Sequence, residues 1–520
     1  MKENTNINKQ QKKSGSAPKK HLRGSSLLLA GRFLAMALNL LAQILIIRYL
    51  SKTDYGMFAY ALTLVAMLTV MNRLGMERAV ARFVPIYDEK NDLASAAGVV
   101  ILAFGILLAL GGATVVLVVG FQGWFAGTLS DDPAVITVLV VLVTLAPVTA
   151  IDNLLESLLS ALDKPRIIFF RKYIIGPCLK LAAISLTLLA SGNVYMLAMS
   201  YMLAGVVGLL LYGFMLKGVL RQHNLMQHFR PGMFSINYRE IFNFSLPTFV
   251  ASLAFAVRPV VIVMVIEFFH ELASVAEFRS VVPVARLNSV VLTSFSMLFI
   301  PMAARLFAQE NRGLLGEMQS HAALWVTVLS FPVFAVCIVL AEPLIVLLLG
   351  ERYASSAPVL AILAVGYFFY SALGLHQRTL RAMGKVKVLL YIEIVSILLL
   401  LAAAWELVPG YGATGGAIAA AGSMIIYVFL NSFALWKITG SNPLPWLYAR
   451  VYLIASACSL GLWLAKSLLG IESTLILMLL VAISSLLVIL SCRKLLQVAE
   501  MFPEVARLPR FIQRALGVKL

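Results

Sequence analysis

Long apolar runs separated by short polar segments dominate the chain. A transmembrane helix needs roughly 20 apolar residues to cross a hydrocarbon core of about 30 Å. Runs of about that length recur from Ser26 to Ser491. They predict an all-α, polytopic membrane protein with about 14 transmembrane helices, at residues 26–47, 55–75, 95–119, 134–158, 167–189, 194–216, 241–266, 280–304, 321–341, 357–377, 388–408, 412–436, 447–469 and 473–491.

The pattern repeats once along the chain, at an offset of about 216 to 223 residues. Phe83-Val84-Pro85 corresponds to Phe299-Ile300-Pro301, and the basic loop 161–166 corresponds to 382–387. Parallel repeats related by an axis along the membrane normal are a transporter architecture, with the substrate site between the halves. We therefore expect two pseudo-symmetric six-helix lobes followed by two C-terminal helices.

This interpretation divides the chain into six parts. The polar segment before the first run has no clear cleavage site after it, so we expect an uncleaved first span and no signal peptide. The expected parts are a basic cytoplasmic tail (1–25), an N-lobe of helices 1–6 (26–216), a cytoplasmic inter-lobe linker (217–240), a C-lobe of helices 7–12 (241–436), helices 13–14 (437–491) and a second basic cytoplasmic tail (492–520).

The charges predict the orientation. The chain is 61% hydrophobic and only 13% charged, with a net charge of +18, whereas soluble proteins average about 25% charged residues. Of the 42 Lys and Arg residues, 33 fall on one side if the N-terminus is placed inside, 5 fall on the other side and 4 lie within spans. Because basic loops stay in the cytoplasm, both termini are expected on the cytoplasmic side. The protein itself is expected in the cell (inner) membrane. Basic residues confined to loops and tails give no reason to expect nucleic-acid binding.

Enzyme chemistry has no sequence support. The four cysteines stand singly in or beside apolar runs, and no metal-ligand spacing, Walker A motif or nucleophile elbow is present. We therefore expect no catalytic residue, metal or cofactor. A glycan polymerase or ligase would be the enzyme alternative, but such enzymes carry a sizeable outer loop, and the predicted outer loops are short.

Ionisable residues inside spans are the candidate binding residues. Each costs roughly 2.5 to 3.5 kcal/mol at mid-bilayer, so several of them should face a polar cavity. Arg32, Asn39 and Gln43 fall within about a 40° stripe of one helix, and arginines exceed buried carboxylates, which favours an anionic substrate. The expected substrate-binding residues are Arg32, Asn39, Gln43, Lys180, Arg258 and Arg286.

Structural roles remain open for these residues. Arg32 is expected about 9 Å from the inner boundary and Arg286 about 9 Å from the outer one, so either side chain could extend to the membrane surface. Asp152 and Glu156 could neutralise Lys180 or Arg166 as a structural ion pair. Arg258 is expected about 25 Å from the inner boundary of the membrane. Glu393 is expected at the membrane interface.

Several motifs, taken in order, resemble a known family. They are Gly31-Arg32 with Asn39 and Gln43, RYLSKTDYGMF at 48–58, LGMERAVARFVP at 74–85, FSLP at 244–247, LGERY at 349–353 and YGATGGA at 411–417. They resemble bacterial polysaccharide flippases, the Wzx-type branch of the multidrug/oligosaccharidyl-lipid/polysaccharide exporter superfamily. The resemblance extends from about residue 25 to 491.

The resemblance implies a flippase that moves polyprenyl-pyrophosphate-linked oligosaccharide from the cytoplasmic to the outer leaflet by alternating access around a cationic lumen. It implies a role in surface polysaccharide biosynthesis, such as lipopolysaccharide or exopolysaccharide, and polysaccharide polymerase and chain-length machinery as partners. Pro259-Val260-Val261 follows Arg258 where many relatives carry another polar residue, which leaves the coupling ion open. The alternatives are a lipid II flippase and a multidrug cation antiporter.

Overall fold

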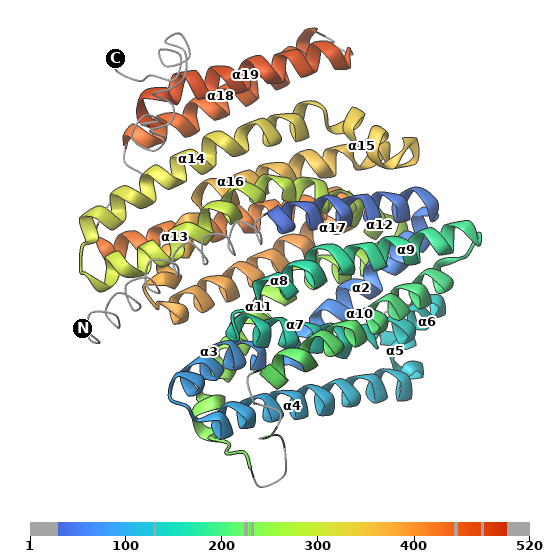
Figure 1. Cartoon of the computed structure of the whole chain (residues 1–520). Coiled ribbons are helices and arrows are strands. Elements are labelled where there is room, and N and C mark those ends of the chain that lie inside the picture. The colour runs from blue at the N-terminus through green and yellow to red at the C-terminus, as the bar shows by residue number, and fades with distance from the viewer. Residues whose placement is uncertain are drawn as a thin grey trace. The chain divides into compact units, whose positions relative to one another are not determined.

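The computed structural model describes residues 30–128, 132–222, 227, 229, 233–440, 446–469 and 473–496. In these ranges the regular structure is helical and no strand occurs, which confirms the all-α prediction (Figure 1). The chain forms two compact units, Met1–Val260 and Val261–Leu520, whose boundary falls inside helix α11 (Tyr238–Phe269).

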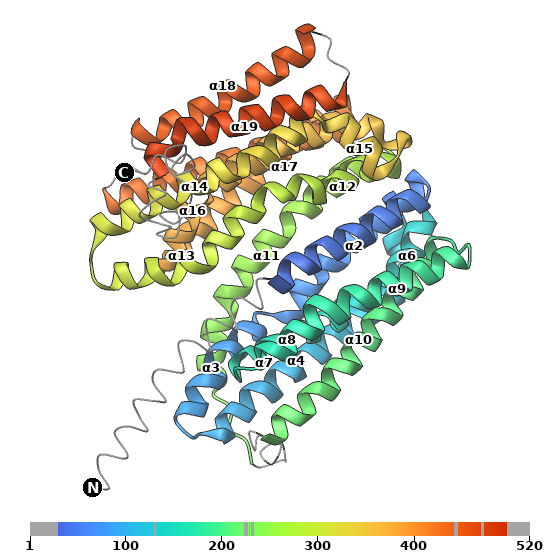
Figure 2. The same ribbon diagram turned by 45° about the horizontal axis from the view of Figure 1, so that its top comes forward.

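The first unit begins with a helix at Ala30–Tyr49. Its further elements, before α11, are α2 (Lys52–Arg73), α3 (Met76–Glu89), α4 (Leu93–Gly120), α5 (Gln122–Thr128), α6 (Pro133–Leu142), α7 (Leu145–Ala161), α8 (Pro165–Ile168), the π-helix η1 (Phe169–Ile175), α9 (Gly176–Leu189) and α10 (Val194–Gln222). Helices α9 and α10 lie side by side (Figure 2).

The second unit contains α12 (Leu272–Arg286), the 3₁₀ turn η3 (Leu287–Ser289), α13 (Val290–Ala308), α14 (Arg312–Val339), α15 (Ala341–Leu349), η4 (Glu351–Ser356), α16 (Ala357–Ala382), α17 (Val386–Thr439), α18 (Trp446–Leu469) and α19 (Thr474–Leu496). Helix α16 packs against α14 and α17. Helices α18 and α19 pack on α14, beside which they run in Figure 1. The expected two-helix extension therefore belongs to this unit.

Among the described residues, each of the fourteen predicted apolar runs lies mainly on helix. Eleven helices among the described residues are long and apolar enough to cross a membrane. One of these, α17, is 54 residues long and breaks at Gly412, so it contains the predicted eleventh and twelfth spans. The fifth span corresponds to α8, η1 and α9, and the thirteenth to α18.

Two segments expected to be loops are helical instead. The basic segment around 73–90 contains α3, and α12 begins at Leu272, before the predicted start of its span at 280. Glu277 and Arg279, which precede the predicted span 280–304, therefore lie inside α12. A search for apolar runs of bilayer length detects only the part of a helix that is apolar enough to lie in the hydrocarbon core. The helix itself continues beyond that part, because its backbone hydrogen bonding does not depend on apolar side chains.

Helix lengths repeat between the units. The candidate spans Lys52–Glu89 and Leu272–Ala308 are 38 and 37 residues long, and each is interrupted internally, at Leu74-Gly75 and at η3. The next spans, Leu93–Gly120 and Arg312–Val339, are both 28 residues long and start 219 positions apart. This agreement in length and order supports the interpretation of the sequence as two repeats.

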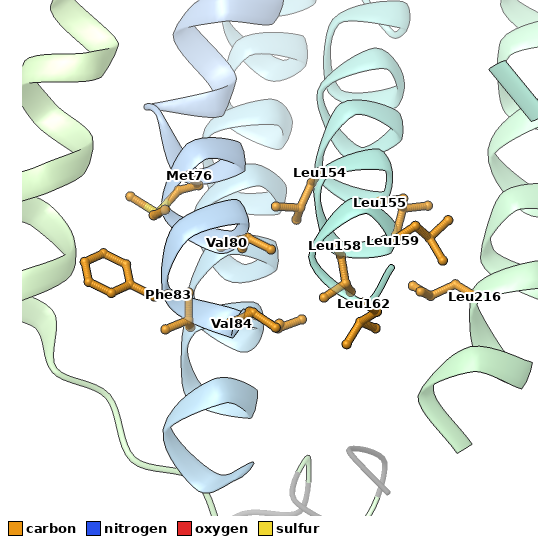
Figure 3. Packing of buried hydrophobic residues seen from close by; sticks show 14 of the residues in the cluster. Met76, Val80, Phe83, Val84, Leu154, Leu155, Leu158, Leu159, Leu162 and Leu216 are labelled. Carbon is orange, nitrogen blue, oxygen red and sulfur yellow. The ribbon is translucent and has the colours of Figure 1, made fainter. Parts of the chain in front are cut away.

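The core of the first unit forms where α3 meets α7 and its neighbours. Met76, Val80, Phe83 and Val84 recur on one face of α3, at the spacing of an amphipathic helix. Figure 3 shows Val80 and Val84 pointing toward the leucines of α7, among them the fully buried Leu158, whereas the Phe83 ring lies on the opposite side of α3 and packs edge-on against Phe244 of α11. The basic residues of α3 lie on its other face, which explains why the segment looked like a loop in the sequence.

The start of α4 fixes the loop that precedes α11. Asp92 caps α4 by accepting a hydrogen bond from the Ser95 N–H at 3.0 Å, and the hydrogen bonding to Ser95 lowers the pKa of Asp92 below its ordinary value. The Ser235 N–H donates to the Ala94 carbonyl at 3.2 Å. A Cβ added at Gly98 would collide with the Ser235 carbonyl oxygen, so only glycine permits this approach.

The break in α17 is fixed by geometry and by a side-chain hydrogen bond. Gly412 has φ 54° and ψ −131°, a conformation that residues with a Cβ rarely adopt. Its backbone cannot continue the helical ladder here, and the His270 ring Nε2 lies 2.8 Å from the carbonyl oxygen of Val408. His270 therefore hydrogen-bonds to a carbonyl beside the break.

Candidate functional site

The first helix carries three predicted binding residues. Arg32 and Asn39 are exposed and Gln43 is half-buried. The Asn39 amide donates to the Ala35 carbonyl of its own helix at 2.6 Å, and the Gln43 amide donates to the Tyr55 hydroxyl at 3.0 Å. Gln43 therefore links the first helix to α2. Arg32 lies on the exposed surface of the first helix.

A π-helical segment, η1, interrupts the predicted fifth span. Short π segments are rare and frequently occur at functional sites. Because a π-helix has more residues per turn than an α-helix, adjacent side chains diverge less around its axis. Arg171 and Lys172 are adjacent in η1, and each reaches a carboxylate of α7.

Arg171 is buried and held from several sides. Its Nη2 lies 2.5 Å from Asp152 Oδ1, its Nε–H donates to the Gly208 carbonyl at 2.9 Å, and its guanidinium lies 5.2 Å from the Tyr212 ring centroid. Only 8% of the side chain is exposed. A Cβ at Gly208 would lie 2.7 Å from Nη2, so glycine provides the space that the guanidinium occupies.

Lys172 pairs with Glu156, one helical turn beyond Asp152 on α7. Its Nζ lies 2.6 and 2.8 Å from the two carboxylate oxygens, and 44% of the lysine side chain is exposed. The expectation that Asp152 and Glu156 neutralise Lys180 or Arg166 is therefore wrong. The i, i+4 spacing of the two carboxylates indicates an ion pair, but it does not show that Arg171 and Lys172, near the start of the predicted span 167–189, are the partners.

Lys180 lies on α9, near the same cluster. Its side chain is exposed, and its Nζ lies 5.5 Å from the Tyr201 ring centroid, a cation–π distance. The Tyr201 ring in turn packs edge-on against Phe58 of α2 at 5.5 Å. Lys180 is also close enough to Asp152 for its positive charge to act on that carboxylate. Lys180 thus lies near Asp152, but the cations that pair with Asp152 and Glu156 are Arg171 and Lys172.

Arg258 precedes a proline inside its helix, and Arg286 is the last residue of its helix. Arg258 is half-buried in α11 and directly precedes Pro259. Arg286 is exposed and is the last residue of α12, directly before η3. Because α12 begins at Leu272, Arg286 lies about 21 Å along the helix from that end.

A carboxylate expected at the interface is buried in the second unit. Glu393 of α17 is 1% exposed. His376 of α16 is fully buried, and its Nδ1 lies 2.6 Å from Ser432 Oγ of α17. Packing of α16 on α17 buries Glu393, which the apolar pattern of either helix alone does not indicate, while its position at the membrane interface stays a prediction.

The chemistry of the site is that of charge recognition. In the first unit Arg32, Lys172 and Lys180 are exposed, and carboxylates of α7 pair with Arg171 and Lys172. Within the described ranges, no group of three or more His, Cys, Asp or Glu residues could hold a metal ion. Exposed cations beside aromatic rings suit recognition of an anion by charge and hydrogen bonds.

Comparisons with known families cover most of the chain. The family model described as "Polysaccharide biosynthesis protein" matches residues 21–307, and the model named MatE matches residues 247–405. An uncharacterised membrane protein of Methanocaldococcus jannaschii, MJ1068, is 22% identical over 435 residues, which are 80% of this chain and 84% of that protein.

Solved transporter structures share the fold. The lipid II flippase MurJ in an inward closed conformation has a TM-score of 0.69 at 15% identity, covering 90% of this chain and 100% of that one. An inward-facing multidrug resistance MATE transporter has a TM-score of 0.67 at 16% identity, covering 78% and 94%. A MOP-superfamily transporter from Pyrococcus furiosus has a TM-score of 0.54 at 16% identity, covering 81% and 96%. The chain is therefore a multi-pass membrane protein with the fold of MOP-superfamily transporters, and it belongs to the polysaccharide biosynthesis protein family.

Proposed function

We propose that the protein is a membrane flippase that moves polyprenyl-pyrophosphate-linked oligosaccharide from the cytoplasmic to the outer leaflet for surface polysaccharide biosynthesis. The observation that carries the proposal is the match of more than half of the chain, residues 21–307, to the polysaccharide biosynthesis family. The exposed cations on helices long enough to span a membrane support it, because a pyrophosphate needs fixed positive charge.

In this proposal Arg32, Arg258 and Arg286 contact the phosphates of the cargo, and Asn39, Gln43 and Lys180 contribute to the same polar path. Both termini lie in the cytoplasm, so Arg32, near the start of the first helix, meets the pyrophosphate first. Arg258 and Arg286, deeper in their helices, bind it later. The polyprenyl tail stays in lipid, since burying it in protein gains nothing over hydrocarbon. The sugar hydroxyls keep polar partners throughout.

Export of glycan in a strain lacking its own flippase tests the proposal. Arg32→Ala, Arg258→Ala and Arg286→Ala should each abolish export, and Lys at these positions should restore only part of it, because lysine lacks the bidentate geometry of arginine. Arg312→Ala is the matched control, since Arg312 begins α14 outside the proposed path. A fluorescent C-terminal fusion measures membrane insertion of each variant. Full export by all three alanine variants would contradict the assigned roles.

A lipid II flippase is the second candidate. The fold of MurJ, named as a lipid II flippase, covers 90% of this chain with a TM-score of 0.69. Lipid II is also a polyprenyl-pyrophosphate-linked saccharide, so the same cations would serve it. Growth of a strain depleted of its lipid II flippase separates the two cargoes: rescue of growth without rescue of glycan export would favour lipid II and overturn the polysaccharide assignment.

A further inference from the structure

Two ion pairs join η1 to α7, and they differ in how easily they can open. Arg171 is 8% exposed, bonded to Asp152 and to a backbone carbonyl, and packed in the space left by Gly208. Lys172 is 44% exposed and Glu156 is 27% exposed. Exposed ion pairs contribute little to stability, whereas breaking a buried pair is costly. Lys172 can therefore exchange its carboxylate for another anion, while Arg171 stays in place.

The start of the first helix contacts the aromatic rings beside Lys172. The Lys172 Nζ lies 5.9 Å from the Tyr173 ring centroid. On the first helix, a Cβ at Gly31 would lie 2.6 Å from Tyr173 Cδ2 and 2.7 Å from the Phe169 ring, so the helix backbone contacts both rings. Arg32 follows directly after this contact. The contact of Gly31 therefore places the start of the first helix, with Arg32, beside the aromatic patch that Phe169 and Tyr173 form next to Lys172.

The charge at this patch suits a group with two phosphates. Asp152 neutralises Arg171, and Glu156 neutralises Lys172 only while their ion pair is closed. Opening of that pair presents Lys172 together with Arg32. A diester-type phosphate carries about one negative charge, so a pyrophosphate matches the two cations. Phosphate oxygens also form short, strong hydrogen bonds with ammonium and guanidinium groups.

We infer that Lys172 and Arg32 form a pyrophosphate-loading site in which Glu156 holds Lys172 until phosphate oxygens replace its carboxylate. This inference rests on the proposed function and extends it to Lys172 and Glu156. Glu156 acts as an internal competitor: it keeps the lysine from attracting other anions, and it returns when the cargo moves on. A phosphate diester could also come from an anionic lipid headgroup, which shares this chemistry.

Binding of farnesyl pyrophosphate to the full-length protein in phosphatidylcholine nanodiscs tests the inference. Lys172→Gln should weaken binding about tenfold, because a charge-assisted hydrogen bond to the phosphate is removed. Lys172→Arg should stay near wild type. Glu156→Gln should tighten binding about two- to fivefold, since the competing carboxylate is absent. Lys52→Gln, at the start of α2 and beyond the end of the first helix that is remote from Arg32, should leave binding unchanged.

The outcomes separate the inference from the proposed function. If the wild-type protein binds the probe but Lys172→Gln and Glu156→Gln bind it equally well, the loading site is wrong while the flippase proposal stands. If the ion pair is merely structural, Glu156→Gln will weaken binding or leave it unchanged, which also overturns the inference. Absence of wild-type binding contradicts the proposed function itself. Equal competition by phosphatidylglycerol nanodiscs would assign the site to a lipid headgroup and overturn its role in cargo loading.

Discussion

Replacing Gly208 by alanine probes the space that holds Arg171. Gly208 lies on α10, where an added Cβ would meet Arg171 Nη2 at 2.7 Å and Cζ at 3.2 Å, whereas ordinary van der Waals separations begin near 3.4 Å. The guanidinium must therefore retreat by about 0.7 Å from α10. That movement pulls the Arg171 Nε away from the Gly208 carbonyl oxygen, from which it now lies 2.9 Å.

The expected cost follows from the weakening of this hydrogen bond. A hydrogen bond from a charged donor contributes about 1.5 to 3 kcal/mol, and the alanine stabilises by about 0.5 to 1 kcal/mol because glycine loses more backbone entropy in a helix. The net change is a decrease of about 0.5 to 2.5 kcal/mol in the free energy of unfolding. Gly213, on the same helix, has no atom within 4 Å of an added Cβ. Gly213→Ala should therefore stabilise by about 0.5 to 1 kcal/mol.

Thermal unfolding of the two purified variants measures this difference. The apparent Tm should fall for Gly208→Ala and rise or stay unchanged for Gly213→Ala, by about 2 to 4 °C per kcal/mol for units of this size. In an Arg171→Ala background the penalty of Gly208→Ala should disappear, because nothing then occupies the space. A Gly208→Ala protein as stable as Gly213→Ala, or a penalty that persists without Arg171, would refute the reasoning.

Two further predictions concern the membrane orientation and the packing of α4. With both termini in the cytoplasm, a cysteine placed at Glu271 should react with a membrane-impermeant reagent added outside the cell. A cysteine placed at Gln309 should react only after the reagent is given access to the cytoplasmic face. The reverse labelling would overturn the orientation. Gly98→Ala should prevent accumulation of folded protein, because its Cβ would collide with the Ser235 carbonyl oxygen. Gly105→Ala, on the same helix with nothing within 4 Å, should accumulate normally, measured by size-exclusion of a fluorescent fusion; equal yields would contradict the packing described.

The sequence alone determined the membrane class, the fourteen helical runs and the duplication. These properties depend on the length and spacing of apolar runs, because a spanning helix must satisfy its own backbone hydrogen bonds and match the bilayer thickness. The motifs were likewise sufficient to indicate the family. Gly412 could not be recognised as a break within one long helix, but the two runs on either side of it were already separated in the prediction.

The tertiary structure decided which charges meet. Asp152 and Glu156 were identified as ion-pair carboxylates, but their partners proved to be Arg171 and Lys172, because η1 presents two adjacent cations to α7 and Gly208 leaves room for one of them. The burial of Glu393 required the packing of α16 on α17. Such pairings depend on how helices distant in sequence pack together, whereas hydrophobic patterning specifies only which face of each helix is apolar.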